Sequence, residues 1–402
     1  MDDFKGKKIL ITQNALHYIA GSELATLELA TFFKDRGAKV SIFTWYTYAP
    51  MRTSFEKQNI EIITDENDKH LNDNFDIIWV HHQVIPKKIL EKLYNNTCRS
   101  KFIFYHMSPL KELALEQPYL YDLEAKIANL VLFTSKGTEE SLLESFPSLK
   151  RHFMVLENFV PNNFLEYKYS RDSLQKILVV SNHPPKEVLS ASKQLKNLGY
   201  EVDIIGRNFN AEIITAKKLV NYDLVITIGK TVPYCLCIGV PVYIYDHFGG
   251  PGFLSAKNFK KARFRTFSGR NFKKKSASII VKEITSYYHS ALQYQQKNLG
   301  HFVELFLLDN QIIKVFKSLD DHTKAPISLE EYNKILAILS LAKDKVNAEN
   351  NLLTILHDMS KTIQEQQSEL TRMGSEYKKI INSKKFRFLS KLSRILHPFS
   401  SS

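Results

Sequence analysis

The chain has 402 residues, enough for two or three domains, and 44% of them are apolar, which excludes a globally disordered protein. Its net charge of +13 favours an anionic partner, such as a phosphorylated substrate, an anionic lipid or a nucleic acid. The sequence has no RRM, KH or zinc-finger signature, so nucleic acid is the least favoured of these.

The cysteines and the chain start indicate a cytoplasmic protein. Cys98, Cys235 and Cys237 give neither a disulfide framework nor a paired metal spacing, which is typical of a reducing compartment. A strand pattern begins almost at the first residue, so we expect no signal peptide. No stretch of about twenty apolar residues occurs, so we expect no transmembrane helix.

Residues 1–168 alternate short apolar runs with helical patterns, which predicts a doubly wound, mainly parallel sheet. Ser22 is expected to cap the first helix and Gly37 to follow its end. The predicted strands cover residues 9–11, 40–43, 60–63, 75–80, 102–105, 130–133 and 153–156.

The loops of this first domain carry the candidate acid–base groups. The loop 12–23 holds His17, a candidate acid or base, and Gly21, which permits close backbone approach to a ligand. Glu23 either orients a substrate group or simply complements the helix dipole. His106 follows another strand and is a further candidate. The His-His-Gln run at 81–83 has no additional metal ligands at a useful spacing.

The second domain, residues 169–320, repeats the alternating pattern. A strand over 176–180 leads into an ordered loop with Ser181 and Asn182, since the prolines that follow bar a helix there. A strand over 202–205 ends near Arg207, which either pairs with a phosphate or is a solvated loop residue. Closing helices are predicted at 277–292 and 301–316.

Residues 223–252 form the most informative stretch. An apolar run ends in a turn of Gly229, Lys230 and Thr231, and a short helical segment and a second apolar run follow. This strand–turn–helix–strand pattern predicts a βαβ unit whose turn presents backbone N–H groups and a lysine charge, which suits a phosphate or pyrophosphate. The spacing does not fit a P-loop, and a turn without a ligand is the alternative.

The glycine-rich run after the second strand is predicted to be a loop that brings backbone close to a ligand, or a mobile lid. The residues expected to contribute there are Asp246, Gly249 and Gly250.

The motif Cys-Ile-Gly-Val-Pro-Val at 237–242 resembles the donor-side motif of GT-B glycosyltransferases, and Ala-Gly-Ser-Glu at 20–23 is similar to the Gly-Gly-x-Glu loop of family 4. The resemblance implies two Rossmann-like domains facing a cleft, with a nucleotide-sugar held by the second domain. Ser181, Asn182 and Tyr234 are candidate donor-binding residues there. The resemblance also implies an acceptor side formed by the first domain, where His106 would lie. Tyr234 and Ile226 stand where the family commonly has glutamates.

Residues 328–381 show a heptad pattern, broken at Glu349, Ser360, Gln367 and Gly374. It predicts either a weak self-associating coiled coil or a single solvated helix. The tail at 384–396 is a basic amphipathic pattern with one apolar face. It favours an anchor at an anionic membrane surface, with docking on the protein's own surface as the alternative.

Together these features predict a metal-independent, cofactor-free glycosyltransferase on the inner face of the plasma membrane. It would move sugar from a nucleotide-sugar to a lipid-linked or glycan acceptor in bacterial envelope polysaccharide synthesis. His106 and Glu23 are the catalytic candidates. A sugar-nucleotide epimerase of the same fold and a non-catalytic scaffold subunit are the alternatives.

Overall fold

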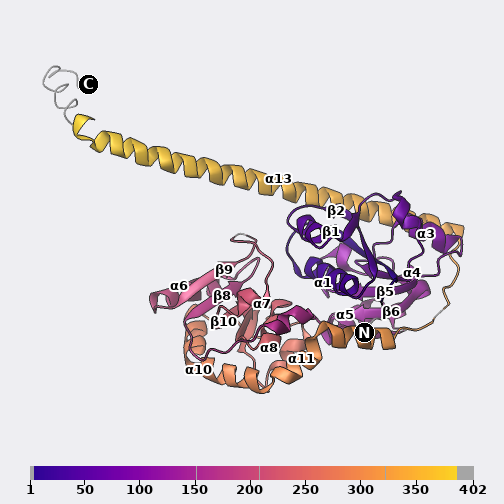
Figure 1. The fold of residues 1–402 in the computed structure, drawn as a ribbon, viewed down its shortest axis with the longest axis horizontal. Helices are drawn as coiled ribbons and strands as arrows, with labels where there is room; N and C mark the ends of the chain where they lie inside the picture. Colours follow the sequence, from indigo (N-terminus) through magenta and orange to yellow (C-terminus); the bar gives the residue numbers. More distant parts are fainter. Residues whose placement is uncertain (1–3, 151, 208, 322, 387–402) are drawn as a thin grey trace. The chain divides into compact units, whose positions relative to one another are not determined.

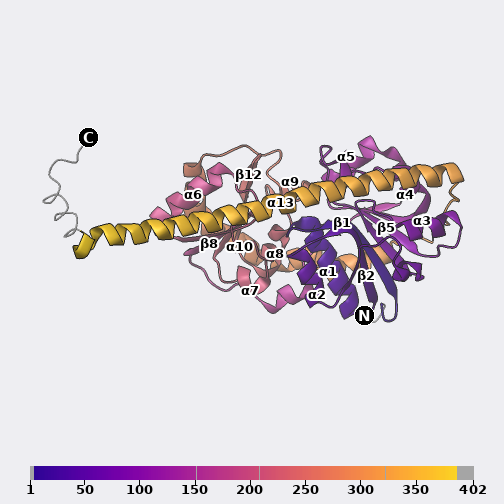
Figure 2. The ribbon, with the colours of Figure 1, turned by 90° about the horizontal axis from the view of Figure 1, so that it is seen from above.

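The computed structural model describes residues 4–150, 152–207, 209–321 and 323–386. These residues form two lobes that each contain one sheet, followed by a long C-terminal helix (Figures 1 and 2). The predicted α/β fold class is confirmed. Residues up to Val346 make one compact unit, and residues from Asn347 make a second, which is described by itself.

The first lobe is built on a parallel sheet with the strand order β3-β2-β1-β4-β5-β6-β7. Its central strands are buried along their whole length, as expected for a sheet with helices on both faces. The strands are β1 (Lys8–Leu16), β2 (Lys39–Thr47), β3 (Glu61–Ile63), β4 (Ile77–His81), β5 (Lys101–His106), β6 (Ala128–Phe133) and β7 (Phe153–Val155). The helices are α1 (Gly21–Asp35), α2 (Met51–Lys57), α3 (Lys87–Tyr94), α4 (Tyr121–Ile127) and α5 (Lys136–Ser145).

The second lobe contains a smaller sheet with the order β12-β11-β10-β8-β9, parallel except for the edge strand β12. The strands are β8 (Lys176–Val180), β9 (Glu201–Ile205), β10 (Leu224–Thr227), β11 (Val242–Asp246) and β12 (Gly249–Phe253). The helices are α6 (Lys186–Asn197), α7 (Ala216–Leu219), α8 (Thr231–Ile238), α9 (Phe259–Phe264), α10 (Ala277–Lys297) and α11 (Leu299–Phe306).

The chain crosses between the lobes twice. It leaves the first lobe through Val160, and it returns after α11 through Leu307 into α12 (Leu308–Lys317). Val160 and the returning chain are hydrogen-bonded: Val160 N–H donates to the Phe306 carbonyl at 2.8 Å, and Leu308 N–H donates to the Val160 carbonyl at 2.9 Å. Leu308, Ile312 and Val315 of α12 then join the first lobe's core.

Three local predictions need correction. The helix expected at 301–316 is broken at Leu307, where the chain pairs with Val160. The glycine-rich run expected to be a loop contains the edge strand β12, antiparallel to β11. The first helix begins after Ala20, without a side-chain cap, and Ser22 lies inside it, where its hydroxyl donates to Glu23 at 2.7 Å.

The long helix α13 (Leu329–Asn382) begins as part of the first lobe. Ile335, Leu339, Ala342 and Val346 are buried in one of its apolar clusters. The predicted domain limits at 168, 320 and 328 stay predictions. The tail from residue 387 onward lies outside the described residues, so the membrane contact predicted for 384–396 stays a prediction.

Gly206 is expected to be essential to the loop that follows β8. A Cβ atom at this position would lie 1.8 Å from the Ser181 carbonyl oxygen, so Gly206→Ala must displace backbone. We expect a loss of about 1–3 kcal/mol in the free energy of unfolding, measured by urea or thermal denaturation. Gly300→Ala is the control, because a Cβ there meets no atom within 4 Å. Equal stability of the two variants would contradict this packing.

Candidate functional site

A cavity of about 430 Å³ lies between the lobes at the carboxyl ends of β8, β10 and β11. Ligands of open parallel sheets bind beyond the carboxyl ends of the strands. The first lobe contributes the turn from Ile19 to Gly21 together with Leu24. The second lobe contributes the loops after its strands. Among the predicted site residues, those that line the cavity are Gly21, Ser181, Asn182, Gly229, Lys230, Thr231 and Asp246.

Two helix N-termini face this cavity. Gly229 adopts φ +61°, a left-handed conformation that suits glycine, and the chain then turns through Lys230 into α8. The first N–H groups of a helix have no acceptor within it, so this turn offers donors to an anion. On the opposite side Gly21 opens α1, and a Cβ there would meet nothing within 4 Å. A Cβ at Gly229 would also meet nothing within 4 Å, so there is room beside both turns, and each helix start contributes the positive end of its dipole.

Lys230 does not extend freely into this cavity. Its Nζ lies 2.6 Å from Oε2 of Glu28, on α1 of the facing lobe, and both side chains are largely buried. Nζ also donates to the Phe159 carbonyl at 3.3 Å, and Tyr234 donates its hydroxyl to the same Glu28. Burial lowers the pKa of Lys230 and raises that of Glu28, while their mutual attraction acts in the opposite direction. The charge predicted to hold a phosphate is thus already compensated by protein.

Tyr234 accordingly has a role that the sequence did not indicate. It does not line the cavity, and its buried ring packs on Phe164 at a centroid distance of 4.5 Å. Its hydroxyl reaches across to the first lobe through Glu28. Tyr234 therefore joins the two lobes.

Further contacts between the lobes surround the cavity. Asn182 donates its side-chain amide to the Ile19 carbonyl at 3.2 Å. The guanidinium of Arg207 lies 3.9 Å from the centre of the Tyr18 ring, a cation–π contact. Two predicted donor-site residues of the second lobe thus contact the loop that follows β1.

Glu23 lies in the first turn of α1, two residues from Gly21. Burial raises the pKa of its carboxyl to about 7; the Ser22 hydroxyl and the Arg207 charge oppose this rise, and Glu116 adds to it. A carboxyl that titrates near neutrality is suited to accept and release a proton. Glu23 does not itself line the cavity, whereas Gly21 and Leu24 of the same helical turn do.

The two histidines proposed for the first lobe lie outside the cavity. His106 is buried, and its Nε2 is 2.9 Å from Oε1 of the buried Glu124. His17 is also buried and stacks on Tyr18 at a centroid distance of 3.9 Å. The structure therefore places His106 outside the cavity, with its ring paired with Glu124 in the lobe interior.

The glycine-rich run also packs against protein. A Cβ on Gly249 would lie 2.4 Å from the Lys273 carbonyl oxygen, and one on Gly250 would lie 2.1 Å from that of Ile244. Asp246 accepts hydrogen bonds from the amides of Phe248 and Gly269, at 2.7 and 2.8 Å. Gly249 and Gly250 thus lie close to the backbone of neighbouring strands and loops. Of the three residues, only Asp246 also lines the cavity.

Metal-binding groups are not clustered in the described part of the chain: no three or more His, Cys, Asp or Glu side chains converge there. His81 and His82 are both buried, and burial lowers the pKa of each. The His81 ring is hydrogen-bonded to Thr26 at 3.0 Å, which gives it a structural role.

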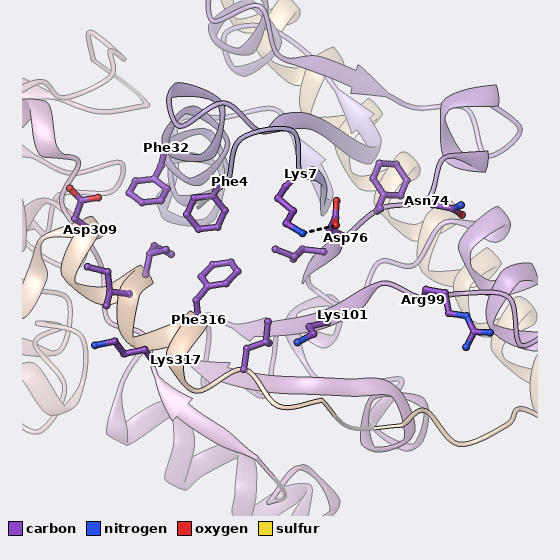
Figure 3. A pocket seen from close by; sticks show the side chains of 15 residues that line it. Phe4, Lys7, Phe32, Asn74, Asp76, Arg99, Lys101, Asp309, Phe316 and Lys317 are labelled. Atoms are coloured by element: carbon purple, nitrogen blue, oxygen red, sulfur yellow. Dashed lines mark hydrogen bonds and ion pairs between the residues drawn. The ribbon is translucent and has the colours of Figure 1, made fainter. Parts of the chain in front are cut away.

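A larger cavity, of about 700 Å³, lies on the amino-end side of the strands of the first sheet (Figure 3). It adjoins the amino ends of β4 and β5, near Ile77 and Lys101. Phe4, Phe32 and Phe316 form its aromatic wall, and Lys7 pairs with Asp76 at 3.1 Å (Figure 3). We assign the functional site to the smaller cavity, because ligands of such sheets bind at the carboxyl ends and both lobes meet there.

Sequence reasoning missed Glu28 and Tyr18, the first-lobe partners of Lys230 and Arg207. A glutamate on the polar side of a helix gives no local signal of a partner two hundred residues away. The cavity-lining His183 and His247 were also missed. They lie in two loops joined by a hydrogen bond of 2.8 Å from the His247 ring to the His183 carbonyl.

Glu28 and Lys230 are expected to contribute to stability jointly. Glu28→Ala or Lys230→Ala leaves one buried charge without its partner and should cost about 3–5 kcal/mol in the free energy of unfolding. The double variant should lose less than the sum of the single losses, because neither charge is then stranded. Thermal and urea denaturation of the four proteins measure this. Strictly additive losses would show that the two residues do not interact.

Glu23 is expected to make stability fall as the pH rises. The folded state keeps its proton up to about pH 7, whereas the unfolded chain loses it near the ordinary value of 4.5. Between these values the unfolded state binds fewer protons, so a rising pH favours unfolding. Glu23→Gln should therefore gain in Tm relative to the parent across this interval. Glu140→Gln, at an exposed glutamate, is the control; the same trend in both variants would refute the assignment.

The comparisons with known proteins agree on the architecture. No protein-family model matches the sequence, and no curated protein sequence matches it. Among solved structures, a glycosyltransferase from Rickettsia africae superposes with a TM-score of 0.52 at 14% identity, covering 78% of this chain and 97% of that one. Anabaena HepE, crystallised with UDP and glucose, gives 0.51 at 16% identity, covering 78% and 99%.

Both structures are matched over almost their full length, so both lobes of this chain are included. The predicted resemblance to GT-B proteins is confirmed at the level of the fold, whereas the closer resemblance to family 4 stays a prediction. This chain has the two-lobed fold of the GT-B glycosyltransferases.

Proposed function

We propose that the protein transfers a sugar from a nucleotide-sugar to an acceptor hydroxyl in the cavity between its lobes. The observation that carries this is the pair of helix N-termini, of α1 and α8, that face one cavity from opposite lobes. Such an arrangement brings an anionic donor and a second substrate together within one enclosed space. Anabaena HepE, of the same fold, was crystallised with UDP and glucose, which supports a nucleotide-sugar as the donor.

The leaving diphosphate would rest on the turn from Gly229 to Thr231. Its negative charge grows as the bond from the anomeric carbon to the diphosphate oxygen breaks, and the amides at the start of α8 stabilise that charge. Lys230 adds its own charge only when Glu28 releases it. We therefore propose that Lys230 pairs with Glu28 in the empty site and with the diphosphate in the loaded one.

Glu23 is our candidate for the base on the acceptor side. The acceptor oxygen forms the new bond to the anomeric carbon and gives its proton to the Glu23 carboxylate. The electron pair of the broken bond leaves with the diphosphate. A carboxyl with a pKa of about 7 is half ionised near neutrality, so it can accept a proton there and release it after transfer.

The acceptor is proposed to be lipid-linked or a glycan of the bacterial envelope. In the described residues no helix is both long and apolar enough to cross a bilayer. We propose attachment through the basic amphipathic tail at 384–396, at the inner face of the plasma membrane. Neither metal nor cofactor is required in this proposal, because helix amides and lysine replace the usual cation.

A second candidate is a non-catalytic subunit with the same fold. It is favoured by Tyr234 in place of the family glutamate and by the pairing of Lys230 with Glu28. Such a protein would keep Lys230 paired with Glu28 even when a donor binds, and it would not turn the donor over. Donor binding and turnover distinguish the two functions.

The decisive experiment combines donor binding with transfer. A thermal-shift panel of UDP-, GDP- and dTDP-sugars should reveal one base that raises the Tm by a few degrees at saturation. With that donor, labelled sugar should be transferred or hydrolysed, and the activity should persist in EDTA. Donor binding without turnover would support the non-catalytic subunit, and complete loss in EDTA would contradict the metal-free mechanism.

Two carboxyl variants then test the base. Glu23→Gln should lower kcat by about 10²–10⁴-fold, the usual worth of a general base. Glu116→Gln should leave the maximal rate nearly unchanged. It should also move the acidic limb of the pH–rate profile to lower pH, because the Glu116 charge helps to raise the pKa of Glu23. A rate that is insensitive to Glu23 would remove it from the mechanism.

A further inference from the structure

The helix α13 presents two different apolar stripes along its length. The first, from Tyr332 to Val346, packs into the first lobe, where Ile335, Leu339, Ala342 and Val346 are each at most 8% exposed. The second is exposed: its side chains are 50–67% accessible. Its members are Leu352, Leu356, Met359, Ile363, Leu370, Met373, Tyr377 and Ile380.

The second stripe has the regular spacing of a coiled coil. Leu356, Ile363, Leu370 and Tyr377 recur every seven residues, the spacing of an a position. Leu352, Met359, Gln366, Met373 and Ile380 recur at the matching d position. Glutamine at 366 is the single polar residue in these nine positions.

The second stripe continues the first one only in part. Extending the first stripe with spacings of three and four leads through Leu356, Ile363, Leu370 and Tyr377, but its other positions are Glu349, Ser360, Gln367 and Gly374, which break the seam. The exposed stripe runs one residue earlier at each of the last three positions, through Met359, Gln366 and Met373. From Val346 to Glu349 and from Glu349 to Leu352 the spacing is three residues twice in succession, whereas a heptad alternates three and four. This irregularity rotates the apolar face around the helix. The first lobe covers the first stripe and leaves the second one exposed.

We propose that the second stripe pairs with the same stripe of a second copy of this chain, as a parallel two-stranded coiled coil over residues 352–380. Gln366 selects this partner and this direction. In a parallel pair it meets its own copy, and the two amides satisfy each other. In an antiparallel pair it faces an apolar a position and loses its hydrogen bonds.

Charge also favours a second copy over a membrane. Residues 352–382 contain four acidic side chains (Asp358, Glu365, Glu369 and Glu376) and four basic ones (Lys361, Arg372, Lys378 and Lys379). A helix that lies on an anionic bilayer has instead a predominantly basic polar face. Two intrahelical ion pairs, Lys361–Glu365 and Glu369–Arg372, are exposed on the helix surface.

A parallel pair brings two basic tails to the same end of the coil. One weak membrane anchor gives only marginal binding, whereas two linked anchors bind far more tightly without any new contact. Dimerisation would thereby convert the sequence at 384–396 into a stable attachment. This inference does not depend on the proposed transfer reaction.

The purified full chain tests the pairing. Light scattering after gel filtration should give twice the chain mass of 46.5 kDa. Leu356→Asp with Leu370→Asp, at two a positions, should give the single-chain mass. Ser368→Asp with Ser375→Asp, which adds the same charge at two f positions, should leave the dimer intact. A single-chain mass for the parent, or a dimer that survives the a-position changes, would overturn the proposal.

A disulfide tests the direction. Ile380→Cys, in a Cys98→Ser background that removes the accessible thiol, should cross-link on oxidation, because parallel strands place the two copies of residue 380 opposite each other. In an antiparallel pair they would lie about 40 Å apart, given a rise of about 1.5 Å per residue. A dimer by mass that does not cross-link would overturn the parallel direction. Unchanged circular dichroism and Tm of the a-position variant would show that the lobes remain folded.

Discussion

The two-lobed structure depends on the buried contact of Glu28 with Lys230 and Tyr234. It joins α1 of one lobe to the start of α8 in the other, at the cavity's edge. Desolvation makes both charges costly, and each is tolerated because the other is present. A donor that carries its own negative charge would offer Lys230 an alternative partner. Under the proposed function, closure of the lobes and binding of a donor would compete for this ammonium group.

The site combines a common position at the strand ends with specific contacts between the two lobes. The turn from Gly229 to Thr231 and the opening of α1 at Gly21 lie where a parallel sheet places its ligands. Around them, Tyr18, Tyr234 and Glu28 form contacts between the lobes. Glu23 lies next to this region, where burial brings its carboxyl to a pKa suited to proton transfer.

The sequence predicted what depends on local pattern and missed what depends on long-range contact. Each strand of the first sheet was predicted near its observed place, because buried parallel strands are short apolar runs between helical patterns. The turn at Gly229 was also predicted, from the strand and helix that flank it. The burial of His106 against Glu124 left no local signal, nor did the pairing of Lys230 with Glu28. Gly249 and Gly250 were predicted to approach a ligand, whereas they make room for neighbouring backbone.

The two crossings between the lobes are hydrogen-bonded to each other at Val160 and Leu307, on either side of one bridge. We expect two connections that are hydrogen-bonded to each other to favour rotation of the lobes about this point over free separation. Such a rotation would open the cavity and separate Glu28 from Lys230 in one movement. A substrate that widens the entrance would then also weaken this ion pair.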